Sequence, residues 1–398
     1  MAAALIISKV LAIYAGPAGL AVVGQFQNVV QLFMTLSKAG VDTGVTKYTA
    51  EYSGFSSQLH TLYSTTFRVV VLFSALAAGI LVFGSHWFSI YFFKTPDYQS
   101  VFVLFALTIF LCALNGICLA IINGLGHIRI FVAANIIQSV AALLLSVGLI
   151  LWFGLKGALY ALVLNQSLVF FVLVYILHKH PIIRIEYFKK AFDGVVAVKL
   201  FKYSIMALVT AVVAPLTTMF IRQDITDQLG FDQAGYWQGM WYISTIFTTV
   251  VTTSLTVYYL PKIASLSKAS DIRMELINGY RIIMPIIIVA SMVMYLMRHL
   301  VINVLFTPEF APVQELFKWQ LVGDVIKISA WLMSYLMLAK AMTVEFISTE
   351  IIFSVFFVCL CIYLTSQFGL IGLSYAYAIN YALYFCAVTM VTRSVWSG

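Results

Sequence analysis

The chain has 398 residues, of which 62% are hydrophobic and only 10% are charged. A soluble protein carries about 25% charged residues, because most of its surface faces water. The composition therefore excludes a soluble globular protein and predicts a polytopic membrane protein. The net charge of +8 could indicate a nucleic-acid partner, but no nucleic-acid-binding motif accompanies it.

Apolar runs follow one another along the chain, separated by short polar segments. Each run is near the roughly 20 residues that span a hydrocarbon core of about 30 Å. We predict a transmembrane helix for each of eleven runs. They are Leu20–Leu36, Val69–Phe88, Val101–Ile122, Ile130–Phe153, Ala158–Leu177, Tyr203–Ile221, Tyr236–Leu260, Ile282–Met297, Leu316–Leu338, Phe346–Phe368 and Leu373–Val391.

A shorter run, Ala2–Tyr14, precedes these eleven. We interpret it as the outer end of an N-terminally truncated first helix, which the turn GPAG (residues 16–19) joins to the second helix. A cleaved signal peptide is the alternative, but the run lacks the basic n-region of a signal. The predicted fold class is thus all-α, with twelve transmembrane helices of which the first is truncated.

An internal repeat with an offset of 215 residues predicts how the helices are grouped. Seven of the thirteen residues in FGLKGALYALVLN (Phe153–Asn165) recur in FGLIGLSYAYAIN (Phe368–Asn380). Self-similarity at about half the chain length is typical of membrane carriers with two homologous halves. We predict two pseudo-symmetric six-helix lobes around a central cavity: an N-terminal lobe (residues 1–178), a cytoplasmic linker (179–202) and a C-terminal lobe (203–398).

The cations are distributed unevenly between alternate loops. Sixteen of the 23 lysines and arginines lie at the C-terminus or in loops after the even-numbered helices, and five lie in the loops of the opposite side. Cationic loops remain on the cytoplasmic side of a membrane. We therefore predict that both termini are cytoplasmic and that the basicity reflects topology.

Polar side chains at helical spacing mark the helix faces that avoid lipid. The second helix carries Gln25 and Asn28 on such a face, and the eighth carries Gln238 and Tyr242. The repeat pairs these two helices. Interhelical hydrogen bonding would explain single polar residues, whereas a polar face on both repeat partners favours a wet cavity in which these four residues bind the substrate.

Two cations, Lys9 and Arg222, lie inside or at the end of predicted helices, each ahead of an Ala-Gly pair. An unpaired cation in hydrocarbon costs about 2.5–3.5 kcal/mol even on the milder insertion scales. Snorkelling to the membrane interface is one interpretation, and it suits Arg222 better than Lys9. The other is an anionic ligand: a diphosphate would satisfy both cations, and arginine binds it bidentately.

The tenth helix has a polar face at spacings of three and four residues. The residues at the corresponding positions of the first half are uncharged, so the fold alone does not require charges there. Asp324 and Lys327 either neutralise each other as a structural pair or form a gating or ion-coupling site. This polar face consists of Gln320, Asp324, Lys327, Trp331 and Ser334.

No pattern in the sequence indicates an enzyme, a cofactor or a metal site.

Five segments carry a family resemblance: GPAGL (16–20), GVTKYTAEY (44–52), GYWQG (235–239), YLPKIASLS (259–267) and FKWQLVGDVIKISAW (317–331). With them the chain resembles, over nearly its whole length, the Wzx-type flippases for lipid-linked oligosaccharides. These form the polysaccharide-transporter branch of the superfamily that also holds the multidrug MATE exporters. The similarity extends to the enterobacterial form that acts on lipid III of the common antigen.

The resemblance implies a bacterial inner-membrane flippase. Its substrate would be an undecaprenyl-diphosphate-linked oligosaccharide, moved from the cytoplasmic to the periplasmic leaflet by alternating access while the prenyl tail stays in membrane lipid. A polymerase and a chain-length regulator of the same pathway are implied partners. Lys9, Arg222, Asp324 and Lys327 stand where similar proteins carry the same charge types. Thr245 stands where enterobacterial relatives carry an acid, so an O-antigen unit and lipid III are both possible substrates.

A MATE-like exporter of drugs or organic cations is the main alternative. A cationic substrate calls for acidic groups, whereas here Lys9, Arg222 and Lys327 outnumber Asp324. A polymerase or ligase would need a large periplasmic loop, and the loops of this chain are close to ordinary connections in length. The charges therefore favour an anionic substrate.

Overall fold

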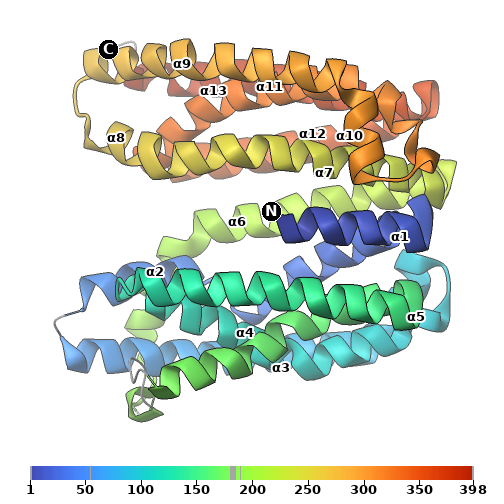
Figure 1. The fold of residues 1–398 in the computed structure, drawn as a ribbon. Coiled ribbons are helices and arrows are strands. Elements are labelled where there is room, and N and C mark those ends of the chain that lie inside the picture. Colours follow the sequence, from blue (N-terminus) through green and yellow to red (C-terminus); the bar gives the residue numbers. More distant parts are fainter. Residues whose placement is uncertain (1, 54, 180–184, 189, 397–398) are drawn as a thin grey trace. The chain divides into compact units, whose positions relative to one another are not determined.

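The computed structural model describes residues 2–53, 55–179, 185–188 and 190–396 (Figure 1). These residues form helices and no strand. The α-helices are α1 (Ala2–Ser37), α2 (Asp42–Glu51), α3 (Ser56–Phe93), α4 (Gln99–Gly124), α5 (Ile128–Lys179), α6 (Gly194–Leu229), α7 (Phe231–Ser254), α8 (Leu260–Ser265), α9 (Ala269–Leu296), α10 (Arg298–Leu305), α11 (Val313–Ala339), α12 (Thr343–Phe368) and α13 (Ile371–Trp396). Short helical turns lie at η1 (Pro96–Tyr98), η2 (Ile185–Phe188), η3 (Leu255–Tyr259, a π-helical turn) and η4 (Pro308–Phe310).

Nine helices within the described residues are long and apolar enough to cross a membrane. Two of them are interrupted by a glycine with non-helical backbone angles: α1 at Gly16 and α5 at Gly154. When these helices are divided there and α7 is added, the segments follow the predicted apolar runs in order. The structure thus agrees with the predicted all-α fold with two six-helix lobes.

The internal repeat forms the same tight helix reversal twice. Gly154 (φ 59°, ψ −135°) breaks α5, and Gly369 (φ 65°, ψ −147°) separates α12 from α13. A positive φ is accessible to glycine without the steric cost that a Cβ imposes. Three residues later, a Cβ at Gly157 or Gly372 would lie 1.8 or 2.2 Å from a carbonyl oxygen of the preceding helix. Both halves therefore use one glycine to turn and a second to let the helices approach.

Contacts between residues divide the chain into two compact units. The N-terminal unit comprises Ala2–Tyr14 and Val22–Leu216, and the C-terminal unit comprises Ala15–Ala21 and Thr217–Gly398. The division falls inside α6 rather than in the predicted linker, of which residues 180–184 and 189 lie outside the described residues. The lobe boundaries derived from the repeat stay a prediction.

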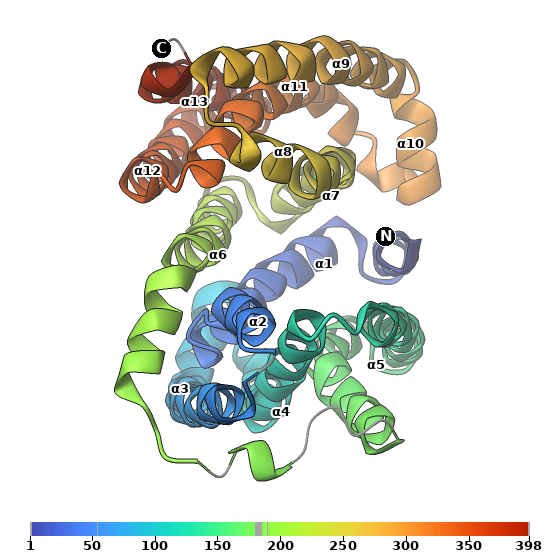
Figure 2. The same cartoon turned by 90° about the vertical axis from the view of Figure 1, so that its left-hand side faces the viewer.

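In the N-terminal unit, α4 packs against α2, α3 and α5 (Figure 2). The contact between α4 and α2 is close, because a Cβ at Gly124 would lie 2.6 Å from the carbonyl oxygen of Thr46. Around it, Val41, Leu62 and Ile121 are fully buried in an apolar core. A glycine on α4 thus allows the short helix α2 to lie against the longer helices.

In the C-terminal unit, α11 packs against α7, α9 and α13, and α12 packs against α13 (Figures 1 and 2). Trp237 on α7, Phe357 on α12 and Tyr377 on α13 belong to one buried cluster in this unit. Because helices surround α11 on several sides, it can carry polar side chains without exposing them to lipid.

Candidate functional site

Asp324 is the most deeply buried charged residue on the polar face of α11, with 0% of its surface exposed. Its Oδ1 accepts hydrogen bonds from the hydroxyl of Ser244 on α7 (2.6 Å) and from the hydroxyl of Tyr377 on α13 (2.8 Å). Two neutral donors on two neighbouring helices therefore hold one carboxylate oxygen. Such hydrogen bonds are needed to keep an acid inside a protein at tolerable cost.

Two neighbours on α11 position these donors. A Cβ at Gly323 would lie 2.3 Å from Cδ1 of Tyr377, so the glycine lets the tyrosine ring approach α11. Gln320, one turn earlier, directs Nε2 toward the hydroxyl of Ser244 at 3.4 Å. Two residues of the predicted polar face, Gln320 and Asp324, thus share one hydrogen-bond network with Ser244 and Tyr377.

Lys327 lies in an aromatic cage, which we define as Trp241, Trp331, Tyr377 and Tyr381. Its Nζ lies 4.7 Å from the ring centroid of Trp331 and 5.1–5.7 Å from those of the other three. Aromatic faces attract cations within about 6 Å, and the attraction is stronger where water is excluded. The cage therefore stabilises the ammonium group through three helices, α7, α11 and α13.

Asp324 and Lys327 are only three residues apart, yet no contact of 4.0 Å or less joins their charged atoms in the described structure. The acid is held by hydroxyl groups and the lysine by aromatic rings. They influence each other electrostatically without forming a direct ion pair. The assignment of this pair to gating or ion coupling stays a prediction.

Glu350 on α12 is a charged residue of this cluster that sequence reasoning missed. It is half-buried and interacts electrostatically with Lys327. The sequence signal was an acid inside the apolar run Phe346–Phe368, which is itself unusual in a membrane segment. Of the residues three and four positions away from it only Ser354 is polar, so the sequence shows no charged or extended polar face here, and the packing of α12 reveals its association with α11.

Arg222 and Gln238, predicted separately as substrate-binding residues, lie together in the C-terminal unit. The guanidinium group of Arg222 donates a hydrogen bond to Oε1 of Gln238 and lies 5.3 Å from the ring centroid of Trp237. Only 2% of Arg222 is exposed, so the side chain points into the protein and does not snorkel outward. Tyr242, one turn after Gln238, interacts electrostatically with the arginine. This places three of the predicted substrate-binding residues in one group.

The remaining predicted substrate-binding residues belong to the N-terminal unit. Lys9 lies half-buried in the first arm of α1, and Gln25 and Asn28 lie in its second arm. Gln25 is 3% exposed and Asn28 is half-buried. Their association with the Arg222 group around a central cavity stays a prediction.

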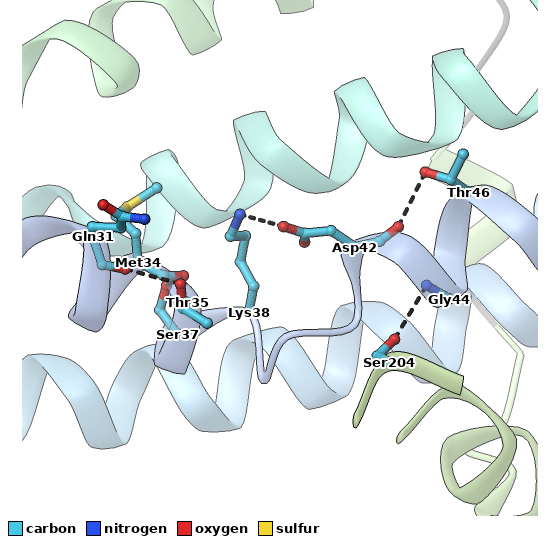
Figure 3. A network of polar contacts seen from close by, with 9 residues as sticks. All are labelled: Gln31, Met34, Thr35, Ser37, Lys38, Asp42, Gly44, Thr46 and Ser204. Atoms are coloured by element: carbon cyan, nitrogen blue, oxygen red, sulfur yellow. Dashed lines mark hydrogen bonds and ion pairs between the residues drawn. The ribbon is translucent and has the colours of Figure 1, made fainter. Parts of the chain in front are cut away.

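A second polar network, at the corner between α1 and α2, was not predicted (Figure 3). Lys38 forms an ion pair with Asp42, and the hydroxyl of Thr46 donates to the carbonyl oxygen of Asp42 (3.1 Å) and to a carbonyl oxygen of α4 (3.2 Å). The backbone amide of Gly44 donates to Ser204 on α6 at 3.2 Å. The corner is thereby attached to two other helices of the N-terminal unit.

The fold is that of known membrane transporters. The chain matches the inward-facing conformation of a multidrug resistance MATE family transporter of the MOP superfamily with a TM-score of 0.83 and 14% identity, covering 99% of this chain and 95% of that one. The outward-facing conformation of such a transporter gives a TM-score of 0.70 at 13% identity, over 98% and 91% of the two chains. The protein is a polytopic membrane protein with the MATE fold.

Sequence comparison defines the family more narrowly. A family model described as "Polysaccharide biosynthesis protein" matches residues 16–315. The lipid III flippases of Escherichia coli (strain K12) and Shigella flexneri are each 31% identical to this chain, over 98% of it and 95% of their own length. The chain belongs to this family of polysaccharide biosynthesis proteins.

Proposed function

We propose that the protein is a flippase that moves an undecaprenyl-diphosphate-linked oligosaccharide from the cytoplasmic to the periplasmic leaflet of the bacterial inner membrane. The observation that carries this proposal is the 31% identity to lipid III flippases over 98% of the chain. The protein would act as a transporter and not as an enzyme, and its substrate would be lipid III or an O-antigen unit.

Within this function, Arg222 and Lys9 would bind the diphosphate. Arginine matches phosphate oxygens with two parallel hydrogen bonds, and a buried site strengthens the attraction. Gln238 supports the assignment of Arg222, because its amide oxygen already orients the guanidinium group. The sugar hydroxyl groups would contact the amide and hydroxyl side chains of Gln25, Asn28, Gln238 and Tyr242, while the prenyl tail remains in lipid.

The charges also argue against the alternative function, export of an organic cation. A cation next to Arg222 or Lys327 would be repelled, and the likeness to MATE transporters, at 14% identity, concerns the fold. Asp324 and Lys327 would serve the conformational cycle, as a gate or as a coupling site. Both termini would lie in the cytoplasm, and a polymerase and chain-length regulator of the pathway would receive the exported unit.

Complementation tests this proposal directly. The gene would be expressed in one strain that lacks its O-antigen flippase and in another that lacks its lipid III flippase, and surface O-antigen and common antigen would be measured. We expect one of the two glycans to return to the surface, which would also identify the substrate. Surface glycan absent from both strains, despite normal amounts of protein in the membrane, would contradict the proposal.

A further inference from the structure

Three charged side chains of the C-terminal unit form a group with an unequal charge count. Lys327 contributes one positive charge, and Asp324 and Glu350, both of which interact with it, can contribute two negative charges. The fully ionised group therefore has a net charge of −1. A net charge in the apolar interior of a membrane protein is costly, and one bound proton would remove it.

Asp324 offers a place for that proton. Its Oδ1 already accepts two hydrogen bonds, from Ser244 and Tyr377. Its Oδ2 is buried and has no hydrogen-bond partner among the described residues, on a side chain with 0% exposure. A buried carboxylate oxygen without a partner is rare and calls for an explanation. Protonation of this oxygen would remove the charge and leave both existing hydrogen bonds in place.

The aromatic cage surrounds the ammonium group of Lys327, and within the described residues no contact of 4.0 Å or less joins that group to either acid. Each ring face stabilises the ammonium group by cation–π attraction, so the lysine does not have to move when a neighbouring acid gains or loses a proton. The ionisable groups around the pair Asp324 and Lys327 are Glu350 from α12 and three tyrosines from α13, Tyr377, Tyr381 and Tyr384. From α7 the cluster meets Ser244 and Trp241, and from α9 the hydroxyl of Tyr280 donates to the carbonyl oxygen of Ser329.

We propose that Asp324, Lys327 and Glu350 form a site that binds one exchangeable proton on Oδ2 of Asp324. In the protonated state a new O–H bond is formed on Asp324, while Glu350 balances Lys327 and the group is neutral. Release of the proton to water returns both electrons of that bond to the carboxylate, and the two acids then share one lysine. The role of this exchange in transport rests on the proposed flippase function, in which it would couple the conformational cycle to a proton gradient.

The same geometry favours a proton over a metal cation. A metal ion needs several oxygen ligands around it, whereas Oδ1 is already occupied by hydroxyl donors. The ammonium group of Lys327 would also repel a second cation, while a proton forms a neutral acid that the lysine does not repel. The ligand of the site is therefore a proton.

Carboxyl protonation in the purified full-length protein tests the site without any transport assay. Infrared difference spectra recorded along a pH titration would follow the carbonyl band of protonated carboxyl groups. Asp324→Asn keeps an acceptor for Ser244 and Tyr377 and should remove the component of the band that Asp324 contributes, seen as the difference between the wild-type and variant titrations. Glu350→Gln should move the midpoint to lower pH by about one unit or more, a tenfold loss of proton affinity, because one competing negative charge is gone. Lys327→Gln should move it to higher pH, because the compensating positive charge is gone.

Glu345 is an exposed acid on α12, the helix that carries Glu350, and it supplies a matched control. Glu345→Gln should leave the midpoint of the Asp324 titration unchanged. Shifts in the same direction for Glu350→Gln and Lys327→Gln, or a titration of Asp324→Asn that is identical to that of the wild type, would overturn the proton site. Complementation by the wild-type protein is scored separately. Failed complementation together with the expected titration would contradict the flippase function and support the proton site. Successful complementation together with a titration other than the expected one would contradict the proton site alone.

Discussion

The hydroxyl of Tyr377 donates a 2.8 Å hydrogen bond to Oδ1 of Asp324. The ring of the same tyrosine lies 5.4 Å from the ammonium nitrogen of Lys327. One side chain of α13 therefore contacts both charged residues of α11, the acid through its hydroxyl and the base through its ring face. Movement of α13 relative to α11 would disturb both charges at once.

Tyr377→Phe should destabilise the folded protein by about 1–3 kcal/mol, the usual cost when a buried polar group loses a hydrogen-bond partner. The measurement is thermal unfolding of the purified protein in detergent. Tyr381→Phe is the matched control, because Tyr381 also contributes a ring to the cage but donates no hydrogen bond to Asp324. Equal effects of the two substitutions would show that the hydroxyl of Tyr377 has no special role.

Gly323→Ala should separate α11 from α13, because the new Cβ would lie 2.3 Å from the Tyr377 ring. Overpacking of this kind costs about 1–3 kcal/mol. Gly79→Ala on α3 is the control, since a Cβ there meets nothing within 4 Å, and it should be neutral or stabilising. Unfolding temperatures of the two variants would be compared with that of the wild type, and a tolerated Gly323→Ala would contradict the close packing.

Arg222→Ala should reduce flipping about tenfold or more, equivalent to about 1.4 kcal/mol or more of lost binding, with normal insertion into the membrane. Arg222→Lys should restore part of the activity, because it returns the charge without the bidentate geometry. The assay is translocation of the lipid-linked oligosaccharide in proteoliposomes. Lys9→Ala should act in the same direction, and wild-type transport by the double alanine variant would remove both residues from the substrate site.

The charge exchange Asp324→Lys with Lys327→Asp should not restore a stable protein. It would place a carboxylate among four aromatic rings whose faces are negative and repel anions, and it would put an ammonium group where Ser244 and Tyr377 now donate. Folded, monodisperse protein in detergent is the measurement. A stable exchanged variant would support a simple neutralising pair in place of two separately built environments.

Cysteine labelling tests the topology. In a background without native cysteines, the exposed Ser270→Cys should react only from the cytoplasmic side, and the exposed Gln228→Cys only from the periplasmic side. The expectation follows from the excess of cations on the side of the membrane to which the sequence assigns Ser270. The reverse labelling pattern would place both termini in the periplasm.

Local sequence patterns were sufficient to predict the long apolar helices but not the short helices α2, α8 and α10. Apolar runs of spanning length located the long helices, and the gaps between the runs at residues 153–158 and 368–373 contain the reversals that the structure shows at Gly154 and Gly369. Helix ends were less predictable: the run that starts at Tyr236 belongs to a helix that starts at Phe231. Polar residues such as Asp232 extend a membrane helix into the interface, where hydropathy gives no signal.

The residues of the candidate site could be identified from the sequence only in part, for a physical reason. Arg222, Gln238, Asp324 and Lys327 were identified because charged and polar residues in apolar segments are conspicuous. Their partners depend on packing between distant helices, which no local pattern specifies. The cage around Lys327 draws rings from α7, α11 and α13, and each ring by itself looks like an ordinary apolar residue of its helix. Glu350 was missed although it is an acid in an apolar run, because its association with Lys327 depends on how α12 packs.

The paired reversals at Gly154 and Gly369 give the chain an internal replicate. The same substitution made at Gly157 and at Gly372 probes one contact in two different surroundings within a single polypeptide. A difference between the two results would measure what the surroundings contribute, with expression level, detergent and temperature held identical.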